Sequence, residues 1–509
     1  GDSEWDLGSM VNTFNTAFTK TAADELGKQR RVKKPWVNKD VLDLCDKRRE
    51  LKNKKGTREG AKQYRKMNNL VKKNMKLAKE KWVNERCEEV ESNLKRNNSK
   101  KAYQLVRDLT TEKTGRATTI QAKDGKCLTE EREIHNRWTE YCSDLYNYEL
   151  HGDPAVLNCP QHYPDEEEYH PILREEVEAA VKSLKKGKSP GVDNVPAELI
   201  QAGGEKVIDA LMLICNKIWK TGEWPSQWTQ SLVITLPKKG NLQQCNNYRT
   251  ISLISHASKV MLRILLNRLK PQAEIIIAEE QAGFRAGRST TEQIFNLRIL
   301  CEKYSQHQLD LYHVFIDFKK AFDRVWHAAL WSTMRTYNIT PSLVRTIESL
   351  YSKASSAVLL NGNIGDWFRT SVGVRQGCLL SPTLFNIFLE RIMTDALENF
   401  EGSVSIGGRK ISNLRFADDI DGIAGSEEEL KSLIGCLDQS SSNYGMEISA
   451  DKTKLMTNHH DGFQEELEVS GQKLGVVSSF KYLGATISDV GSKPEVLSRI
   501  AQTMGAMAK

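Results

Sequence analysis

The stretch LRFADDIDGIAG (Leu414–Gly425) places two adjacent aspartates, Asp418 and Asp419, between two apolar runs. Apolar residues on both sides predict a hairpin of two short strands with the aspartates at its tight turn. Two like charges in a half-buried hairpin repel each other and lose hydration, so the pair requires a neutralising partner. Asp421, two residues further along, is expected to face solvent.

A second acidic residue in an apolar setting lies in VFIDFKKAFDRV (Val314–Val325). Asp317 follows three apolar residues near the end of a predicted strand, whereas Asp323 is assigned to the following helix as a structural residue. A single aspartate after a strand is usually a cap or turn residue. If Asp317 instead lies beside Asp418 and Asp419 on neighbouring strands, three carboxylates share one face of the sheet. Such a cluster requires divalent cations. Mg²⁺ suits such a site because it binds one or two carboxylates and completes its octahedron with phosphates and water.

The composition is that of an ordinary globular protein. The 509 residues, of which 39% are hydrophobic and 27% charged, predict two to four domains. No apolar run approaches the ~20 residues needed to cross a membrane, so no membrane partner is expected. The ten cysteines contain no CxxC pair, which argues against zinc and disulfide frameworks and indicates a reducing, intracellular compartment. The first residues lack the features of a signal peptide, and the absence of an initial Met suggests a fragment.

The positive charge is concentrated near the N-terminus. Between Lys28 and Lys101, 26 Lys or Arg stand against 10 Asp or Glu, although the whole chain carries only +7. A nucleic acid or other polyanion could bind this segment, and a solvated charged helix is the equal alternative. Apolar residues at helical spacing mark one packing face within it: Tyr64, Met67, Val71, Met75, Ala78 and Trp82.

The rest of the chain alternates helical and strand-like patterns, which is typical of an α/β or α+β fold. Residues 117–134 predict a short hairpin with its turn at Asp124-Gly125, and residues 151–171 predict a linker. Ser231–Gly240 and Tyr312–Phe318 are strand-like, whereas residues 210–222 and 258–272 are helix-like.

Three stretches, IDFKKAFD, GVRQGCLLSP and RFADD, resemble motifs A, B and C of reverse transcriptases in their order and approximate spacing. Further matching blocks flank them: KSPGVDNVPAELI, LPKKG, NNYRTISL, EEQAGFRAGRST, GMEISADKTKLM and FKYLG. The sequence thus resembles the reverse transcriptase of a non-LTR (LINE-type) retrotransposon, most closely the RTE-like group, over about residues 171–500. The basic N-terminal region is similar to the segment that joins endonuclease to polymerase in such elements.

This resemblance implies the palm and fingers of a right-hand polymerase, of α/β (α+β) class. Residues 1–155 would be a basic helical N-terminal extension, 156–225 an N-terminal fingers extension, 226–487 the reverse transcriptase domain, and 488–509 the start of a thumb that is largely missing. The implied activity is RNA-directed DNA synthesis from a primer 3′-hydroxyl with two Mg²⁺ ions, for which Mn²⁺ could substitute. The implied partners are an RNA template, a DNA primer or target, and dNTPs.

The resemblance also assigns residues to roles. Asp317 and Asp418 would bind the metals, with Asp419 and the carbonyl of Phe318 in support, and Lys452 would protonate the departing pyrophosphate. The expected dNTP-binding residues are Arg249, Lys238, Phe322, Gln376 and Gly377. Phe322 would be a steric gate against ribonucleotides, although a core phenylalanine is the alternative. The expected template and primer contacts are Arg285, Arg288, Arg375, Tyr482 and Leu483, with structural salt bridges as the alternative for Arg285 and Arg288. Thr250 stands where the family usually has proline, which is expected to loosen a turn.

Two other functions remain open on the sequence. A truncated or host-retained copy could bind nucleic acid without polymerising, or the chain could be another palm polymerase, similar to a group II intron maturase or an RNA-dependent RNA polymerase. Insertion at a genomic target implies nuclear access, and a cytoplasmic ribonucleoprotein is the other expected location.

Overall fold

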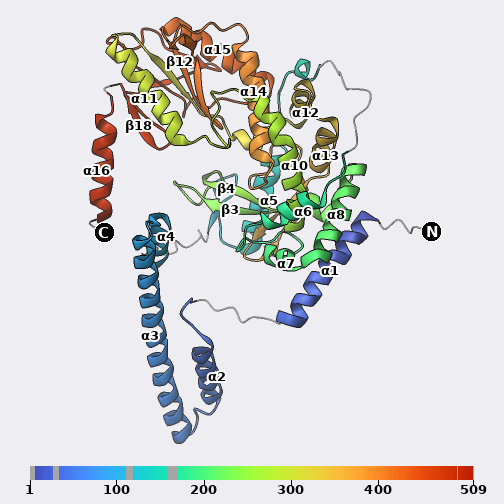
Figure 1. The fold of residues 1–509 in the computed structure, drawn as a ribbon. Helices are drawn as coiled ribbons and strands as arrows, with labels where there is room; N and C mark the ends of the chain where they lie inside the picture. The colour runs from blue at the N-terminus through green and yellow to red at the C-terminus, as the bar shows by residue number, and fades with distance from the viewer. Residues whose placement is uncertain (1–5, 27–33, 111–118, 159–169, 490, 508–509) are drawn as a thin grey trace, which may run out of the picture. The chain divides into compact units, whose positions relative to one another are not determined.

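The computed structural model describes residues 6–26, 34–110, 119–158, 170–489 and 491–507. The chain forms two compact units, one of Lys20–Thr118 and the other of Gly1–Thr19 with Thr119–Lys509. Figure 1 shows the helices and strands of both units. Across the described residues, none of the helices combines the length and the apolar character that crossing a membrane requires.

The described residues of the smaller unit are mainly helical. They include α2 (Lys39–Asn53), α3 (Arg58–Lys95) and α4 (Ser99–Thr110). Asn38 and Thr57 cap α2 and α3, each accepting a hydrogen bond from a backbone N–H of the first turn. The predicted apolar face of α3 is confirmed, because Val71 is buried and Trp82 lies 5.7 Å from Trp36 between ring centroids. The lysines and arginines of α3 are exposed, except Arg86, which is half-buried.

The larger unit contains two five-stranded sheets. In the first, the strands follow the order β4-β3-β6-β7, and β8 also pairs with β6. These strands are β3 (Gln230–Pro237), β4 (Tyr248–Leu253), β6 (Ser355–Leu360), β7 (Asn363–Ile364) and β8 (Phe368–Arg369). Helix α5 (Glu131–Tyr146) covers one face and buries Trp138 and Cys142 against Val233 and Val358.

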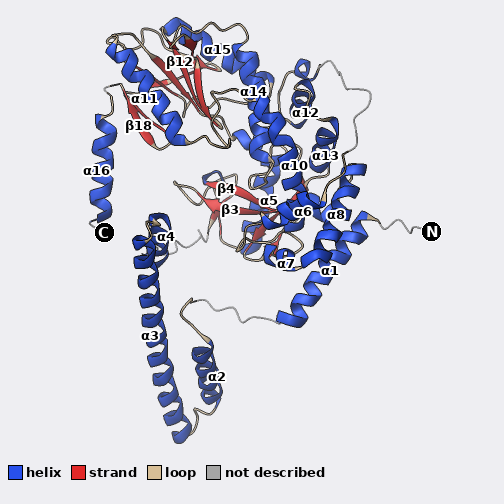
Figure 2. Ribbon diagram, viewed as in Figure 1, coloured by secondary structure: helices blue, strands red, loops and turns tan. Residues whose placement is uncertain are grey.

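The second sheet has the order β11-β12-β5-β13-β16. Its strands are β5 (Tyr312–Ile316), β11 (Asn413–Phe416), β12 (Asp419–Ala424), β13 (Lys454–Thr457) and β16 (Gly475–Val476). Side chains alternate between two cores, because Val314 and Ile316 pack with α15 (Glu427–Asn443), whereas Phe315 packs with α11 (Thr290–Gln306). Figure 2 shows this sheet with α11 and α15 beside it. The hairpin of β17 (Ser479–Tyr482) and β18 (Ala485–Ser488) adds to the core on the α11 side.

The remaining elements complete the larger unit. Its other helices are α1 (Leu7–Leu26), which belongs to this unit as far as Thr19, α6 (Arg174–Lys182), α7 (Ala197–Ala202), α8 (Gly204–Thr221), α9 (Ser226–Thr229), α10 (His256–Ile276), α12 (His327–Thr336), α13 (Pro341–Ser352), α14 (Ser381–Leu397) and α16 (Lys493–Met507). Short 3-10 turns lie at η1 (Pro154–Leu157), η2 (Cys245–Asn247) and η3 (Ala321–Arg324). The short strand pairs are β1 (Ile120–Gln121) with β2 (Cys127–Leu128), β9 (Ser405–Ile406) with β10 (Arg409–Lys410), and β14 (Glu468–Val469) with β15 (Gln472–Lys473).

The strands, helices and hairpin that the sequence predicts are present, but the domain boundary predicted at residue 155 is misplaced. The strands β3 and β5, the helices α8 and α10 and the hairpin at Asp124-Gly125 all form where the sequence predicted them. Residues 119–155, however, belong to the larger unit, because α5 is part of its core. Of the predicted linker, residues 159–169 lie outside the described residues.

Thr250 does not loosen a turn, as the sequence suggested, but lies within strand β4. Its hydroxyl accepts a 2.9 Å hydrogen bond from the buried Tyr146 hydroxyl of α5. This bond ties the helix to the sheet.

Candidate functional site

The two carboxylate-bearing segments meet at one edge of the second sheet. Strands β11 and β12 form the predicted hairpin, with Ala417 at a positive φ of 60° in its turn. Strand β12 pairs with β5 so that Ile420 lies opposite Ile316, which places Asp419 and Asp317 at the same ends of neighbouring strands.

Burial and mutual repulsion act on these carboxylates. Burial raises the pKa of Asp418, and the charge of Asp317 raises it further. Burial, followed by the charges of Asp418 and Asp317, raises the pKa of Asp419 to about 6. The structure therefore brings Asp317 close enough to Asp418 and Asp419 to raise the pKa of both.

Lys452 supplies the only cation in direct contact with this cluster among the described residues. Its Nζ lies 2.8 Å from Oδ1 of Asp317, and its side chain is 63% exposed. The ammonium also lowers the pKa of Asp418 and Asp419 against the larger effects of burial and repulsion. Lysine at this position therefore offsets part of the negative charge.

The donor set suits hard divalent cations. Within the described ranges, no group of three or more His, Cys, Asp or Glu side chains is gathered tightly enough to enclose an ion by itself. Mg²⁺ does not require such a cage, because it binds one or two carboxylates and completes its shell with substrate phosphates and water. The oxygen donors of Asp317 and Asp418, with excess negative charge around them, fit that mode of binding.

A segment far away in the sequence holds the turn that carries Asp418. Gln281, 1% exposed, accepts hydrogen bonds from the backbone N–H groups of Ala417 (2.8 Å) and Gly283 (2.7 Å). Its Nε2 donates to the carbonyl oxygen of Ala417 at 3.2 Å. Sequence reasoning assigned no role to Gln281; the available signal was its place in the EEQAGFRAGRST block.

The basic residues expected at a triphosphate lie on the first sheet. Arg249 is exposed on β4, and Lys238 follows β3. The positive charges of both lower the pKa of Asp323, and that of Arg249 also lowers the pKa of Asp418. Arg249 is thus electrostatically linked to two aspartates around the site.

Asp323, predicted to be a structural residue of the helix after β5, is buried in the 3-10 turn η3. Burial raises its pKa to about 6, against the stabilising hydrogen bond from Gln376. The Nε2 of Gln376 lies 3.0 and 3.2 Å from the two carboxylate oxygens, which fixes the amide. The neighbouring Gly377 has a φ of 104°, and an added Cβ would lie 3.1 Å from the carbonyl oxygen of Ser252.

The two phenylalanines after Asp317 differ in their surroundings. Phe318 is 3% exposed and belongs to the main core. Phe322 is half-buried, stacks on Phe385 with a centroid distance of 4.4 Å, and meets Phe284 edge-on at 6.0 Å. The ring of Phe322 therefore has a packing role, whatever part it takes in nucleotide selection.

Three residues predicted to contact template or primer are turned into the protein. Arg375, 6% exposed, donates to the carbonyl oxygen of Thr229 at 2.5 Å, so the prediction of a direct contact is corrected. Tyr482 is 2% exposed within the core beside α11, which likewise corrects its predicted contact. Arg285, with 5% of its side chain exposed, pairs with Glu274, which supports the structural alternative.

The other two predicted contacts remain partly accessible. Arg288 forms ion pairs with Glu279 and Glu292, and 28% of its side chain is exposed. Leu483 lies at the turn of the β17–β18 hairpin with a φ of 48°. It is half-buried, so part of its side chain reaches the surface.

Asp421 was expected to face solvent, and this expectation was wrong. Its side chain is 0% exposed, and both carboxylate oxygens lie 3.2 Å from Nδ1 of His313. Burial by itself would lower the pKa of His313, but the Asp421 charge outweighs burial and raises it to about 10. The two residues form a buried ion pair between the neighbouring strands β12 and β5, and Asp421 lies two residues after Asp419 of the carboxylate cluster.

This pair predicts a fall in stability at alkaline pH. Because the pKa of His313 is raised to about 10, the folded state holds the proton more tightly than the unfolded chain, where histidine titrates near 6.5. The stabilisation is complete below about pH 6.5 and is lost as the pH rises toward 10. Asp421→Asn should reduce the free energy of unfolding by about 3 kcal/mol at pH 6.5 and flatten the pH profile. Denaturant titrations from pH 6.5 to 9.5 measure both effects; parallel profiles would contradict the pair.

Comparisons with known proteins identify similar chains. The family model described as reverse transcriptase (RNA-dependent DNA polymerase) matches residues 236–487. A probable RNA-directed DNA polymerase from transposon BS of Drosophila melanogaster is 33% identical over 228 residues, which are 43% of this chain and 24% of that protein. The RNA-directed DNA polymerase from mobile element jockey of the same fly is 26% identical over 329 residues, 62% of this chain and 35% of that protein.

Among solved structures, a telomerase from Candida tropicalis, truncated from its C-terminal domain, aligns with 16% identity and a TM-score of 0.38 over 52% of this chain and 55% of that one. The chain spans about a fifth to a third of the length of the first curated relatives it matches. None of these relatives carries the name of the RTE-like group, so that subgroup stays a prediction.

Proposed function

We propose that this chain, which belongs to the reverse transcriptases of non-LTR retrotransposons through residues 236–487, extends the 3′-hydroxyl of a primer with dNTPs along an RNA template. The observation that carries the proposal is the convergence of Asp317, Asp418 and Asp419 at one sheet edge, with Lys452 in contact with the cluster. Such a site catalyses by positioning and by neutralising charge rather than through a covalent intermediate.

Asp317, Asp418 and Asp419, with the carbonyl of Phe318, would hold two Mg²⁺ ions, for which Mn²⁺ is the proposed substitute. When bound, these ions supply activation of the primer hydroxyl and stabilisation of the pyrophosphate that leaves. The carboxylates orient the reacting groups, and Lys452, poised 2.8 Å from Asp317, holds a proton that the leaving pyrophosphate can accept.

The first sheet would bind the nucleotide. We assign the triphosphate to Arg249 and Lys238, because a guanidinium fork suits phosphate oxygens and both charges act on the buried Asp323. Gln376, whose amide Asp323 fixes, would face the nascent base pair beside Gly377. Phe322 would exclude a ribose 2′-hydroxyl, and its stacking on Phe385 would hold the ring in place.

The nucleic acid would be held at further surfaces. We assign a primer contact to Leu483 and a template contact to Arg288, and RNA binding to the exposed basic residues of α3. Phosphate contacts of this kind weaken as salt concentration rises. Target-primed synthesis would require nuclear access, with a cytoplasmic ribonucleoprotein as its precursor.

Primer extension on poly(rA)/oligo(dT) with Mg²⁺ tests the proposal, with the Asp418→Asn variant as control. Incorporation by the wild type that the variant loses supports polymerase activity. Equal incorporation by both overturns the proposed site. No incorporation by either, together with salt-sensitive RNA binding, would show a nucleic-acid-binding protein instead.

Arg249→Ala is expected to raise the KM for dNTP about ten-fold with a smaller change in kcat, because the fork contacts the triphosphate in the ground state and the transition state alike. Arg249→Lys keeps the charge but loses the fork, so its KM should fall between those of the other two enzymes. Steady-state primer extension at varied dTTP measures the three values. Equal KM values for the wild type and both variants would contradict the assignment.

A further inference from the structure

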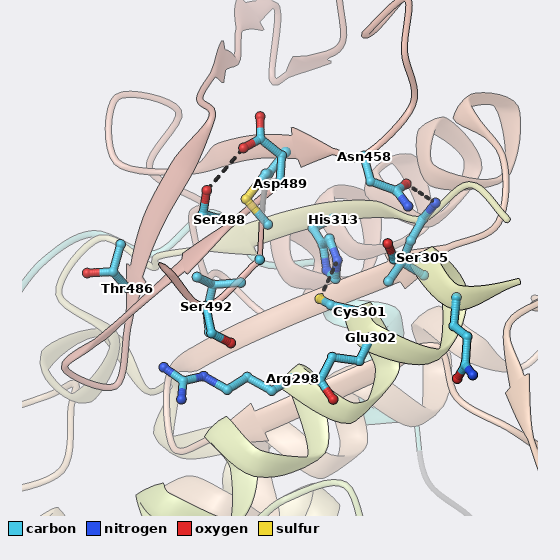
Figure 3. Close-up of a pocket in the computed structure, with 15 residues that line it drawn as sticks. Arg298, Cys301, Glu302, Ser305, His313, Asn458, Thr486, Ser488, Asp489 and Ser492 are labelled. Carbon is cyan, nitrogen blue, oxygen red and sulfur yellow. Dashed lines mark hydrogen bonds between the residues drawn. The ribbon is translucent and has the colours of Figure 1, made fainter. Parts of the chain in front are cut away.

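A pocket of about 440 Å³ lies between α11, the end of β13 and strand β18 (Figure 3). Its walls include Arg298, Cys301 and Glu302 from α11, His313 from β5 and Asp489 after β18. None of the carboxylates of the proposed polymerase site lines it. The volume is in the range of small-molecule sites in proteins.

Three side chains in and behind this pocket form a hydrogen-bonded chain. Nε2 of His313 lies 3.7 Å from Sγ of Cys301, while Nδ1 lies 3.2 Å from the carboxylate of Asp421. The imidazole also stacks on Phe315 at an interplanar angle of 7°, which holds its plane. A thiol beside an imidazolium that a third group orients is an arrangement that activates cysteine for covalent catalysis.

We propose that Cys301 is a nucleophilic thiol that forms a mixed disulfide with a small zwitterionic disulfide, of the glutathione disulfide class, bound in this pocket. The inference does not depend on polymerase activity. It rests on the Cys301–His313–Asp421 chain and on the pocket into which Cys301 opens.

The reaction balances without a further reactant. His313, which Asp421 holds as an imidazolium, donates its Nε2–H to Cys301 and stabilises the thiolate that forms when the thiol proton passes to solvent. The thiolate attacks one sulfur of the bound disulfide, so that a Cys301–sulfur bond forms as the original sulfur–sulfur bond breaks. The departing thiolate takes a proton from solvent and leaves as a free thiol, and His313 stays protonated throughout.

The charges of the pocket fit a zwitterion. Arg298 offers a guanidinium to a carboxylate, and Glu302 and Asp489 offer carboxylates to an ammonium group. Ser305, Asn458 and Ser492 add polar atoms along the wall. Figure 3 shows Arg298 and Glu302 on the same helix as Cys301.

The other described cysteines provide internal controls. Cys87 and Cys127 are exposed. Burial raises the pKa of Cys142, Cys215 and Cys245, that of Cys215 to about 12, which makes these thiols unreactive at neutral pH. Exposure alone would therefore favour Cys87 and Cys127, whereas the proposed chemistry favours Cys301.

The test is to incubate the full chain with glutathione disulfide at pH 7.5 and to follow thiolation of each cysteine by peptide mass mapping. Cys301 should react roughly ten-fold or more faster than Cys87 and Cys127. His313→Gln should remove that advantage in protein shown to be folded by circular dichroism. Equal rates at the three cysteines, or an unchanged Cys301 rate in folded His313→Gln, would overturn the proposal.

A second variant keeps the test decisive if His313→Gln does not fold. Arg298→Met changes a partly exposed residue and should slow the reaction of Cys301 with glutathione disulfide about ten-fold, because the carboxylate loses its partner. The same variant should react at the wild-type rate with uncharged bis(2-hydroxyethyl) disulfide. Equal rates of wild type and Arg298→Met with glutathione disulfide would overturn recognition of a zwitterion in this pocket.

Discussion

Asp418→Asn is expected to lower primer extension by about 10²–10³-fold or more while leaving the fold at least as stable as before. The substitution removes one anionic ligand from the site but keeps the size of the side chain. Burial and the charge of Asp317 already disfavour ionised Asp418, so a neutral amide relieves repulsion in the folded state. Loss of activity without loss of stability distinguishes a functional carboxylate from a structural one.

Single-nucleotide extension and thermal unfolding measure the two quantities on the same preparation. Asp366→Asn is a matched control, because Asp366 is exposed in the loop between β7 and β8 and should behave as wild type in both assays. An Asp418→Asn enzyme that retains more than about a tenth of the activity would remove Asp418 from the proposed chemistry.

Gly283→Ala is expected to cost both activity and stability, although Gly283 bears no functional group. An added Cβ would lie 2.2 Å from the backbone nitrogen of Ala417 and 2.9 Å from Oε1 of Gln281. The turn that carries Asp418 must therefore move, and misplacement of about 1 Å costs roughly a hundred-fold in rate. Overpacking of this kind destabilises by about 1–3 kcal/mol.

Gly435→Ala is the matched control for this prediction. Gly435 lies within α15, and an added Cβ would meet no atom within 4 Å. Alanine in a helix interior should raise the free energy of unfolding by about 0.5–1 kcal/mol and leave extension unchanged. Identical behaviour of Gly283→Ala and Gly435→Ala in denaturant titration and primer extension would refute the proposed hold on the turn.

The features that could be predicted from the sequence depend on residues that are close together along the chain. Apolar runs and turn residues set strands β3 and β5 and the hairpin around Asp418, because these patterns are local. The meeting of Asp317 with Asp418 and Asp419 could be stated only as a condition, since it depends on which strands pair. The resemblance implied that the three carboxylates share one site, and the pairing of β12 with β5 brings them together.

The errors arose where distant segments cover a residue. Asp421 alternates with apolar residues along β12, as a solvent-facing residue would, yet α11 and the β17–β18 hairpin cover that face of the sheet. Arg375 and Tyr482 belong to blocks of a nucleic-acid enzyme, but their side chains complete the interior. Burial by elements far away in the sequence leaves no trace in the local pattern of a single sequence.

The bonds between Gln281 and Ala417 also have a consequence for the order of folding. They join residues 136 positions apart, so they cannot form until that long segment of chain has been synthesised and its ends have met. Closing such a loop costs entropy, and local structure does not offset that cost. Contacts between residues this far apart in sequence therefore form slowly. The hairpin of β11 and β12 can fold early, but its aspartates reach their final geometry only when nearly the whole domain has assembled. During synthesis, the chain therefore acquires its candidate catalytic site late.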